Sequence, residues 1–134
     1  MLIDTLVKRT PILKGFSCDN KYCAEAANGT KYFLRISPLN KYDARRALFE
    51  LLKSLEEFHI PMCKPVEIGT YDEGVYTLFS WIDGIDAKEA IPLYADAKQY
   101  GLGLEAGTLL RKYTRFRPPR NKKIGIRALT EKPI

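Results

Sequence analysis

The sequence has one histidine, His59, in 134 residues, and its three cysteines form no Cys-x-x-Cys pair. A single histidine excludes metal sites built on two or three histidines, and it leaves a Ser-His-Asp arrangement only His59 to use. His59 follows a helical pattern and precedes Ile60-Pro61, so we interpret it as a helix-end residue. An odd number of cysteines cannot pair completely within the chain, which favours a reduced, cytoplasmic protein.

Long apolar runs are also absent. No stretch approaches the roughly 20 residues that a membrane-spanning helix needs. The start, Met1-Leu2-Ile3-Asp4, lacks the charged flank and the apolar segment of a secretory signal. We therefore expect no membrane partner. With 46% hydrophobic and 28% charged residues, the composition is that of a folded domain.

Acidic residues are scarce at one end of the chain. Residues 1–110 contain 13 Lys and Arg against 15 Asp and Glu, whereas residues 111–134 contain nine basic residues and Glu131 alone. The net charge of +6 is the sum of a body at −2 and an end segment at +8. We predict a basic, irregular tail over 114–134. Basic tails can bind nucleic acids, but such runs are usually solvated, and we do not expect nucleic acid as a partner.

The pattern of apolar residues predicts a sheet and two helices. The stretch 42–58 repeats apolar residues at helical spacing, and 94–113 is apolar around much of its circumference, which requires packing on more than one side. Asn28-Gly29 is a strong hairpin signal. We expect five strands, at 12–17, 21–27, 31–37, 66–71 and 75–81. The order predicts an α+β fold, a five-stranded antiparallel sheet with one packed helix, followed by a connector at 82–93 and one further helix.

Three segments of this predicted sheet carry candidate chemistry. They are a glycine turn at 14–19, the cation Arg35 on the third strand, and the end of the fifth strand at Ser80-Trp81-Ile82. A glycine turn over phosphates, a strand cation beneath them and a backbone hinge for a purine are the parts of a kinase nucleotide lobe.

In this order, the segments resemble the aminoglycoside phosphotransferase family of kinase-like small-molecule phosphotransferases. The resemblance covers roughly residues 10–113 and depends on order and spacing. It implies a protein-kinase-like nucleotide-binding lobe over 1–81 and the first helix of a second lobe at 94–113. The matching segments are KGFSCDNKY (14–22), KYFLRIS (31–37), HIPMCKPVEIG (59–69), LFSWIDGID (78–86) and QYGLGLEAGTLLRK (99–112).

The resemblance implies a site for ATP or GTP. Gly15 and Ser17 would approach the triphosphate through backbone N–H groups and a small hydroxyl. Arg35 stands where the family usually has the strand lysine that contacts the α and β phosphates. The plainer interpretation makes Gly15 an ordinary turn residue and Arg35 a solvated cation.

The base would bind at the other end of the same site. The resemblance implies that Phe33 stacks on the purine, while the Ser80 carbonyl and the Ile82 N–H make the hinge hydrogen bonds. The plainer interpretation makes Phe33 a core residue.

Two departures from the family pattern matter. The helix carboxylate that would pair with Arg35 falls on Leu48, and Glu50 lies about 200° further around the helix. No aspartate follows Asp96 and no histidine follows His59, so the catalytic Asp and the Mg²⁺ ligands of the family's second lobe have no counterpart. We therefore predict no catalytic or metal-binding residue in this chain.

The expected function is the nucleotide-binding lobe of a small-molecule O-phosphotransferase, truncated before the catalytic loop and inactive alone. The alternative is a non-catalytic nucleotide-sensing or interaction module derived from such a kinase. The partners expected are a purine nucleotide and, through residues 94–113, a second copy of the chain or the missing second lobe. The sequence leaves the acceptor open.

Overall fold

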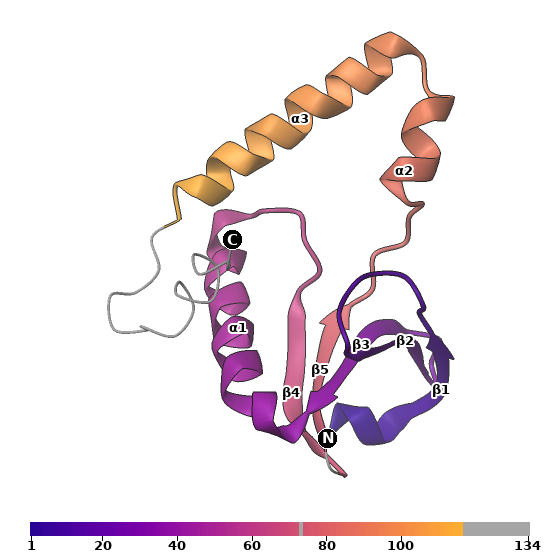
Figure 1. The fold of residues 1–134 in the computed structure, drawn as a ribbon, viewed down its shortest axis with the longest axis vertical. Coiled ribbons are helices and arrows are strands. Elements are labelled where there is room, and N and C mark those ends of the chain that lie inside the picture. The colour runs from indigo at the N-terminus through magenta and orange to yellow at the C-terminus, as the bar shows by residue number, and fades with distance from the viewer. Residues whose placement is uncertain (73, 117–134) are drawn as a thin grey trace.

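A computed structural model describes residues 1–72 and 74–116 (Figure 1). Its five strands form one antiparallel sheet in the order β1-β2-β3-β5-β4, and α1 lies along one face of it (Figure 1). The predicted α+β fold is therefore confirmed. The elements are β1 Leu6–Pro11, β2 Asn20–Ala26, β3 Lys31–Pro38, α1 Tyr42–Leu55, β4 Pro65–Tyr71, β5 Gly74–Ser80, α2 Ala87–Ala90 and α3 Asp96–Thr114. Most of the predicted basic tail, from residue 117, lies outside the described residues.

The first strand differs from the prediction. The expected strand at 12–17 is wrong, because β1 is formed by residues 6–11 and pairs Thr10 with Cys23. At a sheet edge, Lys8 and Arg9 can remain solvated while their backbone pairs with β2. The apolar residues Leu13 and Phe16, which suggested the strand, lie exposed on the following loop.

Cross-strand register separates the residues of the sheet onto two faces. Leu34 of β3 lies opposite Leu78 of β5, and both pack with Ile3 of the 3-10 helix η1 (Leu2–Thr5) in the main core. The neighbouring residue Arg35 pairs with Thr77 and points to the opposite face. That face is covered by α1, since Arg45 of α1 donates to a β3 hydroxyl there. One face of the sheet thus holds the apolar core, and the other holds Arg35.

Glu67 of β4 fastens the N-terminal segment to the sheet. Its carboxylate accepts hydrogen bonds from the Leu2 N–H at 2.9 Å and from the Tyr76 hydroxyl at 2.6 Å. Burial raises the pKa of Glu67, but these hydrogen bonds and one from the Ile3 N–H outweigh it and lower the pKa. Gly69 is required beside this group, since a Cβ there would lie 2.7 Å from the Tyr76 hydroxyl oxygen.

Helix α1 buries Phe49 and Leu55 and passes into a 3-10 turn, η3 (Glu56–Phe58). His59 follows with a left-handed backbone, φ 51°, which ends the helix as αL residues commonly do. The prediction that His59 is a helix-end residue is confirmed.

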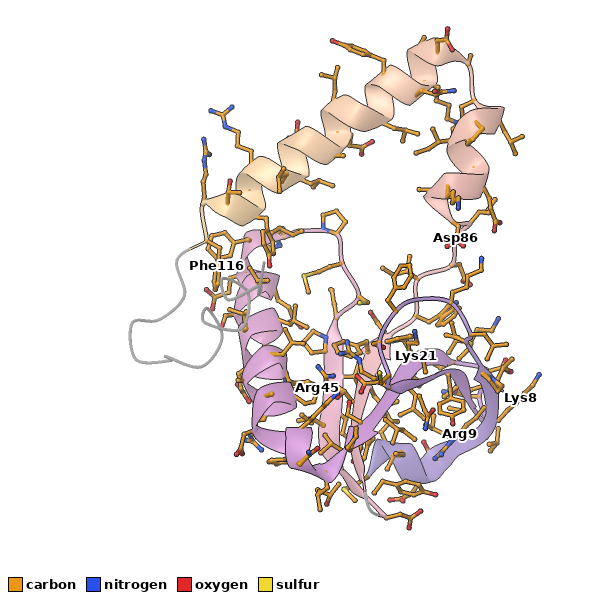
Figure 2. All side chains as sticks on the ribbon, in the orientation of Figure 1. Lys8, Arg9, Lys21, Arg45, Asp86 and Phe116 are labelled. Carbon is orange, nitrogen blue, oxygen red and sulfur yellow. The ribbon has the colours of Figure 1, made fainter. Side chains whose placement is uncertain are left out.

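After β5 the chain leaves the sheet and forms α2, the 3-10 turn η4 (Ile91–Leu93) and α3 (Figure 1). We call residues 87–116 the helical arm. No residue of α3 is buried. At the far end of the helical arm, Phe116 (labelled in Figure 2) packs edge-on against Phe58, with ring centroids 5.4 Å apart. None of the described helices is long and apolar enough to cross a bilayer.

Candidate nucleotide-binding site

The loop between β1 and β2 folds around a lysine. Gly15 has φ +100°, a backbone conformation that glycine adopts without steric cost. The Lys21 ammonium donates to the Lys14 carbonyl at 2.5 Å, and a Cβ on Gly15 would lie 2.7 Å from the Lys21 nitrogen. Figure 2 shows Lys21 beneath the arch of this loop. The missing side chain at Gly15 therefore leaves room for a cation under the loop.

An open pocket of about 310 Å³ lies against this loop. Gly15, Ser17, Asp19 and Lys21 are among its lining residues. The structure therefore brings the two loop residues assigned to the triphosphate, Gly15 and Ser17, together on one pocket with a cation.

Phe33 and Arg35 alternate along β3 and so lie on the same face of the sheet, the face that α1 covers. Both side chains are half-buried. The ring centroids of Phe33 and Phe79 lie 6.0 Å apart, and the Arg35 guanidinium carbon lies 5.9 Å from the Phe79 ring centroid. An aromatic ring and a cation thus stand next to each other, although neither lines the loop pocket.

The hinge residues Ser80 and Ile82 follow at the end of β5. The Ser80 hydroxyl accepts from the Lys64 N–H at 2.7 Å, and the Ser80 N–H donates to the Lys64 carbonyl at 2.8 Å. The Trp81 indole N–H donates to Asp83 at 3.1 Å and braces the connector. Ile82 is 60% exposed, and among the described residues its N–H donates to no acceptor. An unpaired N–H on a braced segment is available to a ligand.

The carboxylate partner of Arg35 comes from the loop. Among the described residues no α1 carboxylate pairs with Arg35; Asp19, just before β2, lies 3.9 Å from it. Asp19 also lies 2.5 Å from Arg45 and 3.7 Å from Lys41, and its side chain is fully buried. Sequence reasoning missed Asp19, Lys41 and Arg45. The available signal was an aspartate in the glycine turn, but its partners are set by the path of the loop.

The cations around Asp19 influence one another. Burial and the neighbouring Arg45 charge lower the pKa of Arg35, while Asp19 acts in the opposite direction. An arginine titrates so far above neutrality that Arg35 remains charged. Burial is the larger cause of the lowered pKa of Arg35, and the Arg45 charge adds to it.

A second set of contacts joins the loop to the helical arm. The Lys14 ammonium donates to Asp86, the residue before α2, and to Glu89 at 3.2 Å. Both carboxylates raise the pKa of Lys14. The tip of the loop between β1 and β2 is thus held against the segment that follows β5.

The described part of the chain builds no metal site from its own side chains alone. Residues 1–72 and 74–116 contain no group of three or more His, Cys, Asp and Glu side chains placed to hold a metal ion. Carboxylate and other oxygen ligands are what Mg²⁺ requires. No chemistry is therefore assigned to a metal on these residues.

The chain matches one family model over most of its length. No curated protein matches the chain significantly. The family model described as "Phosphotransferase enzyme family" (APH) matches residues 8–133. That range contains the glycine loop, the strand cation and the hinge in a single match, and it extends beyond the 10–113 that carry the resemblance. The chain belongs to the phosphotransferase enzyme family.

Proposed function

We propose that this chain binds the purine nucleotide of a kinase-like small-molecule phosphotransferase, ATP or GTP, between the loop at 12–19 and the hinge at 80–82. The observation that carries the proposal is the position of Phe33 and Arg35. They are partly exposed neighbours on the α1 face of the sheet, with the free hinge N–H at one end and the loop at the other. An aromatic ring, a cation and a free backbone donor in this order suit a base followed by phosphates.

The base end of the site uses Phe33 and the hinge. A purine stacked on Phe33 would be in reach of the Ile82 N–H and the Ser80 carbonyl. Bracing by Lys64 and Asp83 keeps this backbone in place before the ligand arrives, which reduces the ordering cost of binding. The phosphate end uses Arg35 with the loop residues Gly15 and Ser17.

Titration calorimetry with ATP, GTP and adenosine tests the proposal. We expect weak binding of a purine nucleotide by the wild-type chain. Ile82→Pro removes the hinge donor and should weaken binding about tenfold, the equivalent of about 1.4 kcal/mol. Ile85→Pro is the matched control in the same connector and should bind normally. No heat from any of these ligands at millimolar concentration would refute a nucleotide site.

We expect the chain alone to transfer no phosphoryl group. Phosphoryl transfer needs a residue that positions the acceptor hydroxyl, and no aspartate follows Asp96 in this sequence. A radiolabelled γ-phosphate assay with kanamycin or choline as acceptor checks this, and measurable transfer by pure chain would contradict it. A nucleotide-sensing module would also bind without turnover. The encoding locus separates the two, since a transferase lobe requires an adjoining HxDxxxxN-like segment.

We also propose that α3 is covered by a second copy of the chain or by a second lobe. Tyr100, Leu104 and Leu110 are 71%, 57% and 61% exposed. Sedimentation at several concentrations should show association that Leu104→Lys with Leu110→Lys shifts toward monomer, whereas a monomer at ~100 μM would contradict self-association.

The setting we propose is cytoplasmic, supported by three cysteines that form no disulfide in the structure.

A further inference from the structure

Three cations from two elements and the turn between them surround the single buried carboxylate of Asp19. Arg35 comes from β3, Lys41 from the turn before α1, and Arg45 from α1. Together the four groups carry a net charge of +2. Lys21 adds to this excess, since it pairs directly across the strands with Arg35, and like charges in that position destabilise a sheet.

Asp19 satisfies these cations incompletely. Only Arg45 lies within hydrogen-bond distance, at 2.5 Å, while Arg35 and Lys41 are 3.9 Å and 3.7 Å away. One carboxylate oxygen, Oδ1, is buried without a hydrogen-bond partner among the described residues. The cluster therefore has more donors than its carboxylate engages, together with an unused acceptor.

A phosphate group fits this cluster better than a carboxylate does. It has three acceptor oxygens and a charge near −2, so it balances more of the +3 of Arg35, Lys41 and Arg45 than the single negative charge of Asp19 does. Arginines bind phosphate in paired geometry, and lysine binds it as a point charge. Asp19 also lines the loop pocket beside Gly15 and Ser17, so the cluster borders the place assigned to the triphosphate.

We propose that Arg35, Lys41 and Arg45 form a phosphate-binding site and that Asp19 is its resident anion, which a nucleotide phosphate displaces. The location of the nucleotide rests on the proposed function. The proposal adds Lys41 and Arg45 as ligands of the phosphate chain. It also makes Asp19 an internal competitor, so that binding of a phosphate releases the end of the loop from the sheet.

The simpler interpretation is a structural ion cluster that fastens α1 to the sheet. The Arg45 guanidinium supports that role too, since it donates to the Ser37 hydroxyl at 2.9 Å. The two interpretations differ in what removal of Asp19 does. A structural cluster loses stability and gains no ligand, whereas a competing anion, once removed, leaves the cations free for phosphate.

Calorimetric titration of the full chain with sodium tripolyphosphate and, separately, with adenosine tests the proposal. Asp19→Asn should tighten tripolyphosphate binding about tenfold, and Arg45→Gln should weaken it about tenfold. Asp43→Asn and Arg46→Gln, the same changes at exposed α1 positions, should leave it unchanged. Affinities within twofold of wild type for both cluster variants would overturn the proposal.

The two ligands separate this proposal from the proposed function. Adenosine binding without any response of tripolyphosphate to the cluster variants refutes the phosphate site and leaves the purine site intact. If the cluster variants change tripolyphosphate affinity as expected but adenosine does not bind, the purine site is refuted and the phosphate site is supported.

A wild-type measurement covers the case in which Asp19→Asn does not fold. Saturating tripolyphosphate should shift the ¹³C resonance of the Asp19 carboxyl group as its pairing with Arg45 is lost. An unchanged resonance at saturation would overturn the proposal. Lys41→Gln, at a partly exposed position, should reduce tripolyphosphate affinity about threefold and the salt dependence with it.

Discussion

The sheet with α1 and the helical arm differ in what covers their leucines. Leu34 and Leu78 of the sheet are fully buried, whereas Leu104 and Leu110 of α3 are more than half exposed. Both regions have apolar residues at the spacing of their secondary structure, but only the sheet has covering layers, η1 on one face and α1 on the other. Apolar periodicity therefore defines a surface that can be buried, and a second layer decides whether it is.

The main helix of the arm, α3, also has a sequence of low intrinsic helix stability. Helix α3 contains Gly101, Gly103 and Gly107, and each glycine costs a helix interior about 1 kcal/mol relative to alanine. With three glycines and no buried residue, α3 lacks, within residues 1–72 and 74–116, the tertiary packing that supplies most helical stability in proteins. This contrast supports the proposal that another chain or lobe covers α3.

The largest expected difference in the free energy of unfolding comes from truncating a leucine to alanine in each of the two regions. Leu34→Ala should lower the free energy of unfolding by about 2–5 kcal/mol, because it leaves a cavity between β3 and η1. Leu110→Ala, at an exposed position, should change it by less than about 0.5 kcal/mol. Urea unfolding of both variants at low protein concentration measures the difference. Equal losses would show that the α3 leucine is buried in solution.

Replacing a glycine by alanine should lower stability in the sheet and raise it in the helical arm. Gly69→Ala places a Cβ against the Tyr76 ring and should destabilise the sheet by about 1–3 kcal/mol. Gly107→Ala meets no atom within 4 Å and should stabilise α3 by up to about 1 kcal/mol. Thermal unfolding followed by circular dichroism checks both. Destabilisation by Gly107→Ala would mean that something packs closely against that face.

The hydrogen bonds to Glu67 give the sheet a pH dependence. Because they lower the folded-state pKa of Glu67, its stabilisation is complete above the unfolded value of about 4.3. It is lost as the pH falls through the lower folded pKa. Glu67→Gln should cost about 1 kcal/mol at pH 7 and should remove part of the acid sensitivity. Urea unfolding from pH 7 to pH 3 measures this, and parallel curves for wild type and variant would exclude Glu67 as the source.

The smallest effect is expected where the two regions meet. Lys14→Gln removes the contacts with Asp86 and Glu89, which are exposed and therefore add little to global stability. The loop at 12–18 should nevertheless exchange its amide hydrogens faster, while those of β3 remain unchanged. Hydrogen exchange at low salt detects the change, with Lys88→Gln as the control on α2. Unchanged exchange in the loop would show that Lys14 does not hold it.

Several features followed from the sequence alone, because local physics determines them. The positions of α1 and of four of the five strands, the connector after β5 and the glycine turn were predicted from periodicity and turn residues. His59 was identified as a helix end from the preceding pattern and the following proline. The order of these segments also indicated the family, which the match over residues 8–133 confirms.

Tertiary structure decided the features that depend on contacts between elements far apart in the sequence. β1 is formed by residues 6–11 because backbone pairing with β2 outweighs the charges of Lys8 and Arg9, and the more apolar loop remains exposed. Arg35 has a carboxylate partner because the loop carries Asp19 across to the α1 face. The register of β2 against β3 already brings Asp19 near Arg35, but its contacts with Lys41 and Arg45 depend on how α1 packs on the sheet. The packed structure thereby places one anion among three cations, whose charges offset the cost of burying it.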